Sequence, residues 1–576
     1  MPGPATIRYG GLAGSLLLAL AAARHGADAS WSPTMTARTI LSGVDGWLTP
    51  AAWLAGTLLL VTAWWLGRRR VPSLRWAYVT AALWALPLLF VLPLGSYDVY
   101  SYACQGWALA AGHDPYAAGV AAYQCPWLDA VAPTWRDAPA PYGPVFLLLA
   151  ALAALTGGSL TGVIALLRLT AVLGVVLIAV CVPVLARRHA VDPARAVWLA
   201  VACPLVPIHL ISGAHNDAVM VGLLTAGLAL AAADHLPTTP SPSPAARPRS
   251  PRLTLGRLAP AAGPRSPRLT LGRLAPAWLA PAWLASAAGP RRAWLAPASY
   301  PRATGLIAAG ALIGLAGGVK ATALVVLPFA MLPLRRNWLV LPGALASLGV
   351  VSLASGLGFG WVTALSGSGV SVQWTSPPTA VGMTAALFGA GDAAITVTRL
   401  LGLAALAVLL VVLFCRFALR TNSRPLRPQP ASSDSPQVSE VGDGGSRLAA
   451  PVGTQSWKRS SRASAADIAQ ADGADSGDSR LEATLGTQSK AAAVAMAATV
   501  ALAPVFHPWY LTWPLAVLAA TLRRDTLWLV VPCAVASVLC LPDGYNLALA
   551  TKAQGAIAMT AVVIGVIGYA VRRRRA

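Results

Sequence analysis

Charged residues are scarce in the sequence, and acidic residues are especially so. Among 576 residues only 20 are aspartate or glutamate, and the two glutamates are Glu440 and Glu482. Charged residues make up 11% of the chain, whereas 56% of it is hydrophobic. An ordinary soluble domain carries roughly 25% charged residues. This composition excludes a typical soluble protein and predicts a chain that lies in a bilayer.

Cysteine is also scarce, and the Cys-x-x-Cys spacing that is typical of metal sites is absent. Most of the seven cysteines lie within apolar runs, where we expect buried small side chains. Cys104 and Cys125 are the exceptions, because both lie in a polar segment. They are able to pair if that segment faces an oxidising compartment.

Apolar runs recur along the whole chain and predict an all-α, polytopic integral membrane protein. A helix of about 20 apolar residues crosses a hydrocarbon core of about 30 Å while satisfying its own backbone hydrogen bonds. We expect about 14 spans, within a range of about 12 to 16. The predicted spans cover residues 10–23, 50–66, 76–94, 162–186, 195–212, 214–233, 304–318, 321–334, 338–358, 394–416, 491–506, 508–522, 526–541 and 553–571. A shorter run, 143–157, is expected to be re-entrant or interfacial.

The net charge of +23 is explained by topology rather than by nucleic-acid binding. Basic residues gather at the ends of apolar runs and in polar inserts, for example at 68–70 and 572–575. The positive-inside rule then places every basic cluster, both termini and both inserts on the cytoplasmic side of the plasma membrane. Arg168 lies within a predicted span, so we expect it to face protein or a cavity.

Two polar inserts divide the membrane body. The first contains the tandem repeat PRSPRLTLGRLAPA, and both are predicted to be disordered and cytoplasmic. The predicted parts are an N-terminal membrane region 1–234 with an outer loop 95–142, an Arg- and Pro-rich insert 235–302, a central membrane region 303–419, a linker 420–490 and a C-terminal membrane region 491–576.

Five polar segments adjoin the predicted spans, and the predicted topology places all of them on the extracytoplasmic side. They are SYDVYSYACQG, SGAHNDAVM, GGVKAT, FGWVTALSGSGVSVQWTSPPTA and FHPWYLTWP. Their convergence on one side predicts a site there. Because both glutamates lie in the second insert, a catalytic carboxylate of the membrane body must be an aspartate.

Asp98 is the best-placed aspartate, because it follows a predicted span within one helical turn. If the segment is helical, Asp98, Tyr102 and Gln105 share one face. A carboxylate between apolar walls can acquire the basicity that a general base needs. The alternative interpretation is that Asp98 caps a helix N-terminus.

The triplet His215-Asn216-Asp217 places three hydrogen-bonding side chains at a membrane boundary. A helix cap would explain Asn216 or Asp217 but not all three, so we expect contacts with a substrate or a phosphate. As a metal motif the triplet is weak, because no third ligand lies nearby in sequence. No metal site is predicted.

Other polar residues are candidates for substrate binding. Lys320, in a turn next to two glycines, can bind a phosphate as a point charge, or else it reaches toward the interface. His507, Trp509 and Tyr510 combine a titratable ring with aromatic rings able to stack on a sugar, although an aromatic belt is the alternative. Tyr116 can also face a sugar.

Several segments, in order, resemble one enzyme family. They are DVYSYACQGWALAAGHDPY, YGP, GAHNDAVMVGLL, GGVKAT and HPWYLTWPL. They are similar to the actinobacterial polyprenol-phosphate-mannose-dependent α-1,6-mannosyltransferases of the MptB kind, in the GT-C superfamily. The resemblance spans nearly the whole membrane body, and the two inserts fall outside it.

The resemblance implies a GT-C-like fold whose large first extracytoplasmic loop carries an essential aspartate, here Asp98. It implies polyprenyl-phosphate mannose as the donor and a lipid-linked mannan as the acceptor, as in lipomannan and lipoarabinomannan synthesis. Asp98 would deprotonate the acceptor hydroxyl, and the anomeric centre would invert. Lys320 and His215 would stabilise the leaving phosphate. A divalent cation bridging Asp217 or Asp98 to the phosphate is compatible with this scheme, although no spacing requires one.

Two alternatives remain open. A flippase or transporter of lipid-linked sugars would also have many spans, but its polar residues should lie near the bilayer midplane and its halves should repeat. A related enzyme that uses another polyprenyl-phosphate sugar is the second alternative. The sequence has no Asp-x-Asp motif of the kind found with nucleotide-sugar donors, which agrees with a lipid donor.

Overall fold

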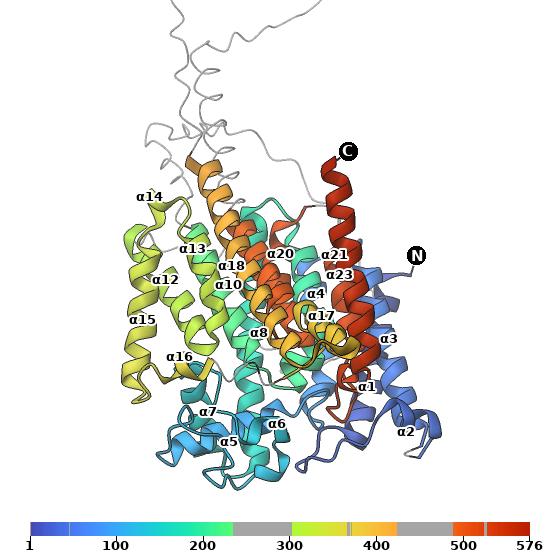
Figure 1. Cartoon of the computed structure of the whole chain (residues 1–576). Helices are drawn as coiled ribbons and strands as arrows, with labels where there is room; N and C mark the ends of the chain where they lie inside the picture. Colours follow the sequence, from blue (N-terminus) through green and yellow to red (C-terminus); the bar gives the residue numbers. More distant parts are fainter. Residues whose placement is uncertain are drawn as a thin grey trace, which may run out of the picture. The chain divides into compact units, whose positions relative to one another are not determined.

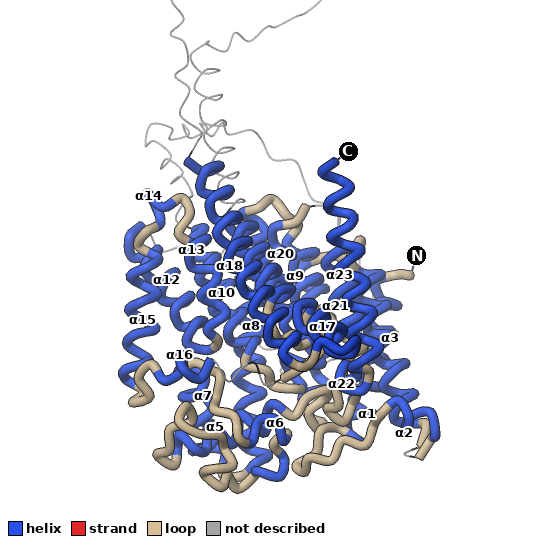
Figure 2. The backbone as a smooth tube through the Cα atoms, viewed as in Figure 1, coloured by secondary structure: helices blue, strands red, loops and turns tan. Residues whose placement is uncertain are grey.

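The computed structural model describes residues 2–44, 46–233, 302–365, 369, 371–422, 488–523 and 527–575. Within these ranges the chain is helical without a strand, as Figure 2 shows, and Cys540 and Asn546 form an isolated β-bridge. The all-α prediction is therefore confirmed for the described residues. The predicted inserts 235–302 and 420–490 lie outside the described residues except at their edges.

Five described helices are long and apolar enough to cross a membrane. They are α1 (Pro4–His25), α3 (Leu48–Gly67), α8 (Leu160–Arg188), α18 (Ala393–Asn422) and α23 (Lys552–Arg575). A sixth span results if α9 (Pro193–Val201) and the π-helical turn η3 (Val206–Ser212), which meet at 62°, are taken together. The predicted total of about 14 spans stays a prediction.

Shorter apolar helices occupy most of the other predicted spans. They are α4 (Leu74–Ala85) with η1 (Leu86–Leu89), α7 (Pro144–Gly157), α10 (Asp217–Ala233), α12 (Arg302–Val319), η6 (Ala321–Val326) with α13 (Leu327–Ala330), α15 (Val340–Ala354) and α21 (Leu527–Ala536). Residues 488–502 are also helical.

The remaining helices are short, and several connect the longer ones. They are α2 (Ala37–Ser42), α5 (Asp98–Ala110), η2 (Leu128–Ala130), α6 (Pro133–Arg136), α14 (Leu334–Asn337), α16 (Gly360–Ala364), α17 (Pro377–Ala385), η8 (Ala386–Ala390), η9 (Pro508–Leu511), α20 (Thr512–Thr521) and α22 (Leu547–Ala550).

Some helix boundaries differ from the sequence expectation. The expected span 195–212 is broken between α9 and η3, where Pro204 lacks the N–H group that would continue an α-helix. The expected span 76–94 stops being helical at Leu89. The polar segment FGWVTALSGSGVSVQWTSPPTA, expected to be an outer loop, instead contains α16 and the first residues of α17, which packs on α18 and α23.

Close helix packing depends on small residues and on paired tryptophans. A Cβ on Gly14 of α1 would lie 2.7 Å from the carbonyl oxygen of Gly56 in α3, and a Cβ on Gly56 would lie equally close to that of Gly14. Only glycine permits these helices to approach so closely. The indoles of Trp64 in α3 and Trp198 in α9 donate to each other's backbone carbonyls, at 3.1 and 2.9 Å. Both buried N–H groups are thereby satisfied.

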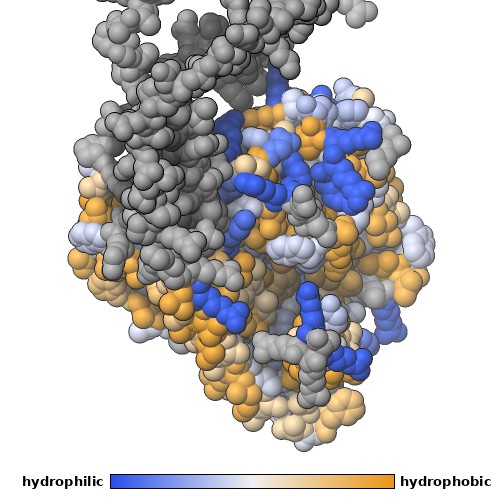
Figure 3. Space-filling model, turned by 90° about the horizontal axis from the view of Figure 1, so that it is seen from above, coloured by the Kyte–Doolittle hydropathy of each residue, from blue (hydrophilic) through white to orange (hydrophobic). Residues whose placement is uncertain are grey.

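Figure 1 shows α5 and α6, with their connecting loops, at the end of the helices opposite to the end where α23 terminates. Around His189, after the last turn of α8, three basic groups gather: Arg188, Arg523 and Lys490. Burial chiefly, and then these cations, lower the pKa of His189 to about 4. Seen from above, the surface has hydrophilic patches next to hydrophobic ones (Figure 3).

Candidate functional site

Asp98 is the first residue of α5, and it does not occupy the N-cap position that the alternative interpretation gave it. Tyr97 is the N-cap residue, and the backbone N–H of Asp98 donates to Ser96 Oγ at 3.1 Å. The carboxylate is 15% exposed. Burial raises the pKa of Asp98 to about 6; Lys320 acts in the opposite direction and Asp217 adds to the rise.

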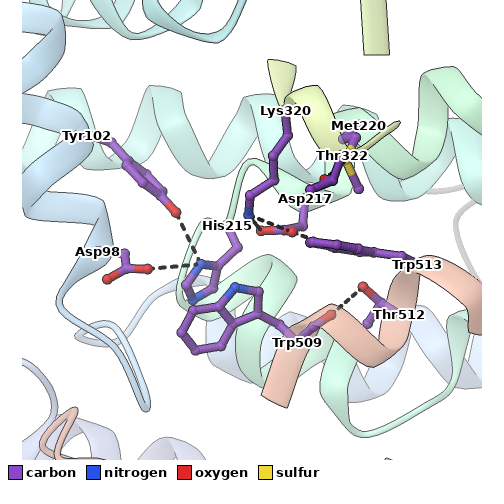
Figure 4. A network of polar contacts seen from close by, with 10 residues as sticks. All are labelled: Asp98, Tyr102, His215, Asp217, Met220, Lys320, Thr322, Trp509, Thr512 and Trp513. Carbon is purple, nitrogen blue, oxygen red and sulfur yellow. Dashed lines mark hydrogen bonds and ion pairs between the residues drawn. The ribbon is translucent and has the colours of Figure 1, made fainter. Parts of the chain in front are cut away.

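His215 lies in the turn that precedes α10, and its imidazole ring is next to the Asp98 carboxylate. Its Nδ1 is 3.7 Å from Asp98 Oδ2 and 3.2 Å from the hydroxyl of Tyr102 (Figure 4). The ring is fully buried, and Nε2 has no hydrogen-bond partner among the described residues. His215 therefore lies against the Asp98 carboxylate and is held there by its contact with Tyr102.

Asp217 and Lys320 form a buried ion pair on the other side of the cluster (Figure 4). Lys320 Nζ donates to Oδ1 and Oδ2 of Asp217 at 2.9 and 3.1 Å. The indole of Trp513 donates to the same Oδ1 at 2.6 Å. Asp217 is fully buried, whereas the lysine side chain is 12% exposed. An ammonium has three N–H groups, so one of them is left for a ligand.

Three aromatic rings surround the ammonium of Lys320. Its Nζ lies 4.6 Å from the ring centre of Tyr510, 5.3 Å from that of Trp513 and 5.8 Å from that of Tyr142. Tyr510 and Trp513 stack on each other at 4.3 Å. The negative faces of such rings stabilise a cation that has lost part of its water. The ammonium of Lys320 thus lies among the faces of three aromatic rings.

Trp509 lies between two histidines and connects the two sides of the site. Its ring stacks on His215 at 3.8 Å and on His507 at 4.7 Å. Burial first, and then the charge of Lys320, lower the pKa of His507 to about 3. His507 is consequently neutral at physiological pH, and it is a hydrogen-bonding group rather than a cation.

Two pockets meet at this cluster. The first, here called the lysine pocket, has a volume of about 150 Å³. It is lined by Tyr142, Lys320, Thr322, Leu365, Tyr510 and Trp513, among others. The second, here called the amide pocket, has a volume of about 90 Å³. It is lined by Trp31, Tyr97, Ser371, Gln373, Gly544 and Asn546, among others. Both pockets are lined by Asp98, Trp135, His507 and Trp509.

Arg168, to which the sequence gave no role, ties together the segments that carry Asp98 and His215. Its guanidinium donates to the carbonyls of Leu89, Val91 and Ser212 at 2.7 to 3.1 Å. The hydroxyl of Ser212 in turn accepts from the backbone N–H of Leu94 at 3.1 Å. Buried carbonyls that no helix satisfies thereby find a partner.

The structure brings most of the predicted site residues together and places three elsewhere. Asp98, Tyr102, His215, Asp217, Lys320, His507, Trp509 and Tyr510 form the cluster described above. Gln105 and Asn216 are buried, with side-chain atoms unpaired among the described residues, and neither lines one of the two pockets. Tyr116 donates to the carbonyl of Tyr142 at 2.9 Å and packs against Trp361 and Leu348. Their roles in substrate binding stay predictions.

The structure also pairs Cys104 with Cys125 in a disulfide, the pairing that the sequence left open. Cys104 lies in α5, six residues after Asp98, and Cys125 lies in the following loop. The bond therefore fixes the loop to the helix that carries the carboxylate.

Sequence reasoning missed several lining residues. Tyr142 was considered only as part of the segment YGP, and Trp513 only as part of the segment FHPWYLTWP. A signal existed for Trp513, because it follows Trp509 at helical spacing. Trp31 and Asn546 carry no local signal.

Among the described residues, no group of three or more histidine, cysteine, aspartate and glutamate side chains is placed to hold a metal ion. Asp217 is instead paired with Lys320. A divalent cation that bridges a carboxylate to a phosphate stays a prediction.

Comparison with known proteins places the chain in a family. The model of the MptA and MptB family, described as "Alpha-(1->6)-mannopyranosyltransferase, N-terminal domain", matches residues 8–336, which is more than half of the chain. The chain belongs to this mannopyranosyltransferase family. The MptB C-terminal domain matches residues 484–569. The family resemblance inferred from the sequence is therefore confirmed, and Asp98, His215 and Lys320 all lie within the first matched range.

Relatives in the family are found in mycobacteria and corynebacteria. An alpha-(1->6)-mannopyranosyltransferase of Mycobacterium tuberculosis is 31% identical over 467 residues, which cover 77% of this chain and 65% of the relative. Alpha-(1->6)-mannopyranosyltransferase A of the same organism is 30% identical, over 63% of this chain and 62% of the relative. Alpha-(1->6)-mannopyranosyltransferase B of Corynebacterium glutamicum is 28% identical, over 58% and 50%. The chain thus spans less than two thirds of the length of these relatives. No solved structure matches it.

Proposed function

We infer that the chain is a membrane mannosyltransferase. It moves mannose from polyprenyl-phosphate mannose to a lipid-anchored mannan and forms α-1,6 links with inversion, in synthesis of the lipomannan and lipoarabinomannan type. The observation that carries this proposal is the position of Asp98, which lines two adjoining pockets, one of which also contains Lys320. A transferase that uses a general base needs that base next to both substrate-binding sites, because the acceptor hydroxyl and the donor must be held close together. Family membership supports the choice of mannose.

Asp98 acts as the general base. The acceptor hydroxyl loses its proton to the carboxylate while its oxygen attacks the anomeric carbon of the donor. The bond from that carbon to the phosphate oxygen breaks, and the electron pair leaves with the polyprenyl phosphate. A carboxylate with a pKa of about 6 is largely ionised at neutral pH and more basic than an exposed aspartate. Attack from the face opposite to the leaving group converts a β-linkage into an α-linkage.

Lys320 stabilises the leaving phosphate. Two of its N–H groups are held by Asp217, and the third is free to meet an anion in the lysine pocket. Charge that develops on the phosphate oxygen is thus met by a cation already in place, which lowers the barrier. His215 does not line this pocket, so its proposed role changes from contact with the phosphate to positioning of Asp98.

The site is proposed to face the extracytoplasmic side. The helix α23 ends in arginines at the end of the helices opposite to α5 (Figure 1). Basic groups also gather around His189, which follows the last turn of α8. The positive-inside rule assigns such basic ends to the cytoplasm. The disulfide between Cys104 and Cys125 supports the same orientation, because disulfides persist in oxidising compartments. Membrane lipids are then the natural surroundings of both substrates.

The proposal is tested in membranes that contain the chain, with radiolabelled polyprenyl-phosphate mannose and a short α-1,6-mannoside acceptor. We expect the wild type to transfer mannose and the Asp98→Asn variant, expressed to the same level, to lose transfer by at least 100-fold, the lower end of what a general base contributes. Full transfer by Asp98→Asn would remove the general base. Movement of the lipid between leaflets without transfer would favour a flippase, and transfer from another polyprenyl-phosphate sugar alone would change the donor.

A further inference from the structure

The two pockets beside Asp98 differ in charge, and this difference assigns the substrates to them. The lysine pocket contains a cation and a largely apolar lining that includes Leu365 and Val505. The lining of the amide pocket contains one carboxylate, Asp98, and neither lysine nor arginine. Its one histidine, His507, is neutral, because burial lowers its pKa to about 3. An anionic lipid phosphate therefore fits the lysine pocket, and a neutral ligand fits the amide pocket.

We propose that the amide pocket is the acceptor site, in which the carboxamides of Gln373 and Asn546 bind hydroxyl groups of a neutral oligosaccharide and the indoles of Trp31 and Trp135 hold its sugar rings. This assignment rests on the proposed function, because it concerns the second substrate of the same transfer. It places the attacking hydroxyl beside Asp98, across from the lipid donor.

The two carboxamides are hydrogen-bonded to each other and oriented in advance. Asn546 Nδ2 donates to Gln373 Oε1 at 3.0 Å, and Gln373 Nε2 donates to Ser371 Oγ at 2.9 Å. A carboxamide nitrogen carries two N–H groups, so each residue keeps one for a ligand. Gln373 is only 4% exposed, so an N–H group that makes no hydrogen bond there is costly to bury. A ligand hydroxyl that accepts from this N–H group removes that cost and thereby gains binding free energy.

Both residues are held by contacts that extend far along the chain. The Oδ1 of Asn546 accepts from the backbone N–H of Ala548 at 2.9 Å and caps α22, so its nitrogen faces the other way. Next to Gln373, the Ser371 carbonyl accepts from Arg399 Nη2 at 2.7 Å. The Thr375 hydroxyl donates to the carbonyl of Phe506 at 3.1 Å. Such support is what a binding site needs to hold its geometry.

Aromatic rings complete the lining. Trp31 packs edge to face on Tyr97 at 4.6 Å, and its backbone N–H donates to the carbonyl of Asp129 at 2.7 Å. Trp31 and Trp135 are partly exposed, in contrast to the buried Trp509. A partly exposed indole offers an apolar face to the C–H side of a sugar ring. Hydroxyl-binding amides together with such faces suit a neutral glycan and leave its reacting hydroxyl to the carboxylate.

The test measures the KM for the α-1,6-mannoside and for the lipid donor separately in two variants. Asn546→Asp keeps the cap of α22 but removes the Nδ2 donor, and Gln373→Met removes the carboxamide at similar size. We expect each to raise the acceptor KM roughly tenfold, the effect of one lost hydrogen bond, with the donor KM unchanged. The control is Trp374→Phe, next in the chain to Gln373, whose indole instead donates to Thr551 and lines neither pocket. This variant should keep both KM values.

A second measurement does not depend on the amides. Thr134 is exposed and lines the amide pocket, so Thr134→Cys provides a thiol for maleimide labelling, which is read by mass spectrometry of its peptide. The mannoside should slow labelling, and the lipid donor should not. The assignment is overturned if the donor protects this thiol and the mannoside does not, or if both amide variants keep the wild-type acceptor KM. Either result leaves the proposed transfer intact, whereas absence of transfer by the wild type would remove the function itself.

Discussion

The ammonium of Lys320 is held by both oxygens of Asp217, at 2.9 and 3.1 Å, in a part of the molecule where the carboxylate is fully buried. The pair thus has two consequences. It orients a cation toward the lysine pocket, and it makes each partner costly to remove alone.

The first prediction concerns the stability of this ion pair. Lys320→Met leaves the Asp217 charge buried without its ionic partner, so we expect a loss of about 3–5 kcal/mol in the free energy of unfolding. The double variant Lys320→Met with Asp217→Asn should lose less than the sum of the single variants, because no unpaired charge remains. Thermal unfolding in detergent measures both. Lys552→Met, at an exposed lysine, is the control, and strict additivity would contradict the coupling.

A second prediction follows from the pKa of Asp98. The base must be deprotonated, so kcat/KM should fall as the pH drops through about 6. The hydrogen bond from Ser96 lowers this pKa and the charge of Asp217 raises it. Ser96→Ala should therefore move the acidic limb to higher pH, and Asp217→Asn should move it to lower pH. A pH profile of transfer checks the signs, and shifts in the same direction would refute the assignment.

Arg168 gives a third prediction. Because its guanidinium binds three backbone carbonyls, Arg168→Lys loses several charged hydrogen bonds, each worth about 1.5–3 kcal/mol. We expect a lower unfolding temperature and a lower kcat with little change in the donor KM, since Asp98 and His215 would lose alignment. Arg195→Lys is the matched control, with a hydrogen bond to the carbonyl of Leu522. Equal effects of the two variants on kcat would argue against a positioning role.

The fourth prediction concerns the disulfide. Cys104 and Cys125 close a loop with a sequence separation of 21 residues. Loops of this size give about 3 kcal/mol of stability on a chain-entropy basis. Cys104→Ala with Cys125→Ala should lower the unfolding temperature, whereas Cys415→Ala, at an exposed free cysteine, should not. Counting thiols in the denatured protein should give two more after reduction, and an unchanged count would show that the bond is absent.

The fifth prediction is the orientation. Ala111 follows α5 and is exposed, and Arg70 is exposed after α3. In a Cys415→Ser background, a membrane-impermeant maleimide added to intact cells should label Ala111→Cys and leave Arg70→Cys unlabelled. Opened membranes should allow both to react. The reverse pattern would turn the proposed site toward the cytoplasm.

The sequence predicted the helical fold of the described residues because apolar runs are a local signal, whereas the number of spans stays a prediction. It also predicted Asp98 with Tyr102, since helical spacing puts both on one face of α5. The same spacing suggested Gln105, which is buried with its Oε1 unpaired among the described residues and lines neither pocket. His215 was predicted to contact a substrate or a phosphate. Its burial depends on Trp509, nearly 300 residues away, which no local pattern reveals.

The amide pocket could not be predicted from the sequence either, because its lining also depends on contacts between residues that are distant in the sequence. Trp31, Gln373 and Asn546 come from three distant parts of the chain, and each looks ordinary in its own segment. In the sequence, Asn546 is typical of a helix N-cap, and in the structure it does cap α22. Only the folded chain shows that its second polar group faces a pocket.

The lining residues that both pockets share determine how far water can reach Asp98. Asp98, Trp135, His507 and Trp509 line both pockets, so in the proposed transfer a lipid donor bound alone would leave the base open toward the amide pocket. A water molecule there would be a competing nucleophile, and the sugar would be lost to hydrolysis instead of being passed on. Filling the amide pocket with a glycan removes that competitor. In the proposed transfer, a base placed where two bound ligands together exclude water would protect the donor from hydrolysis.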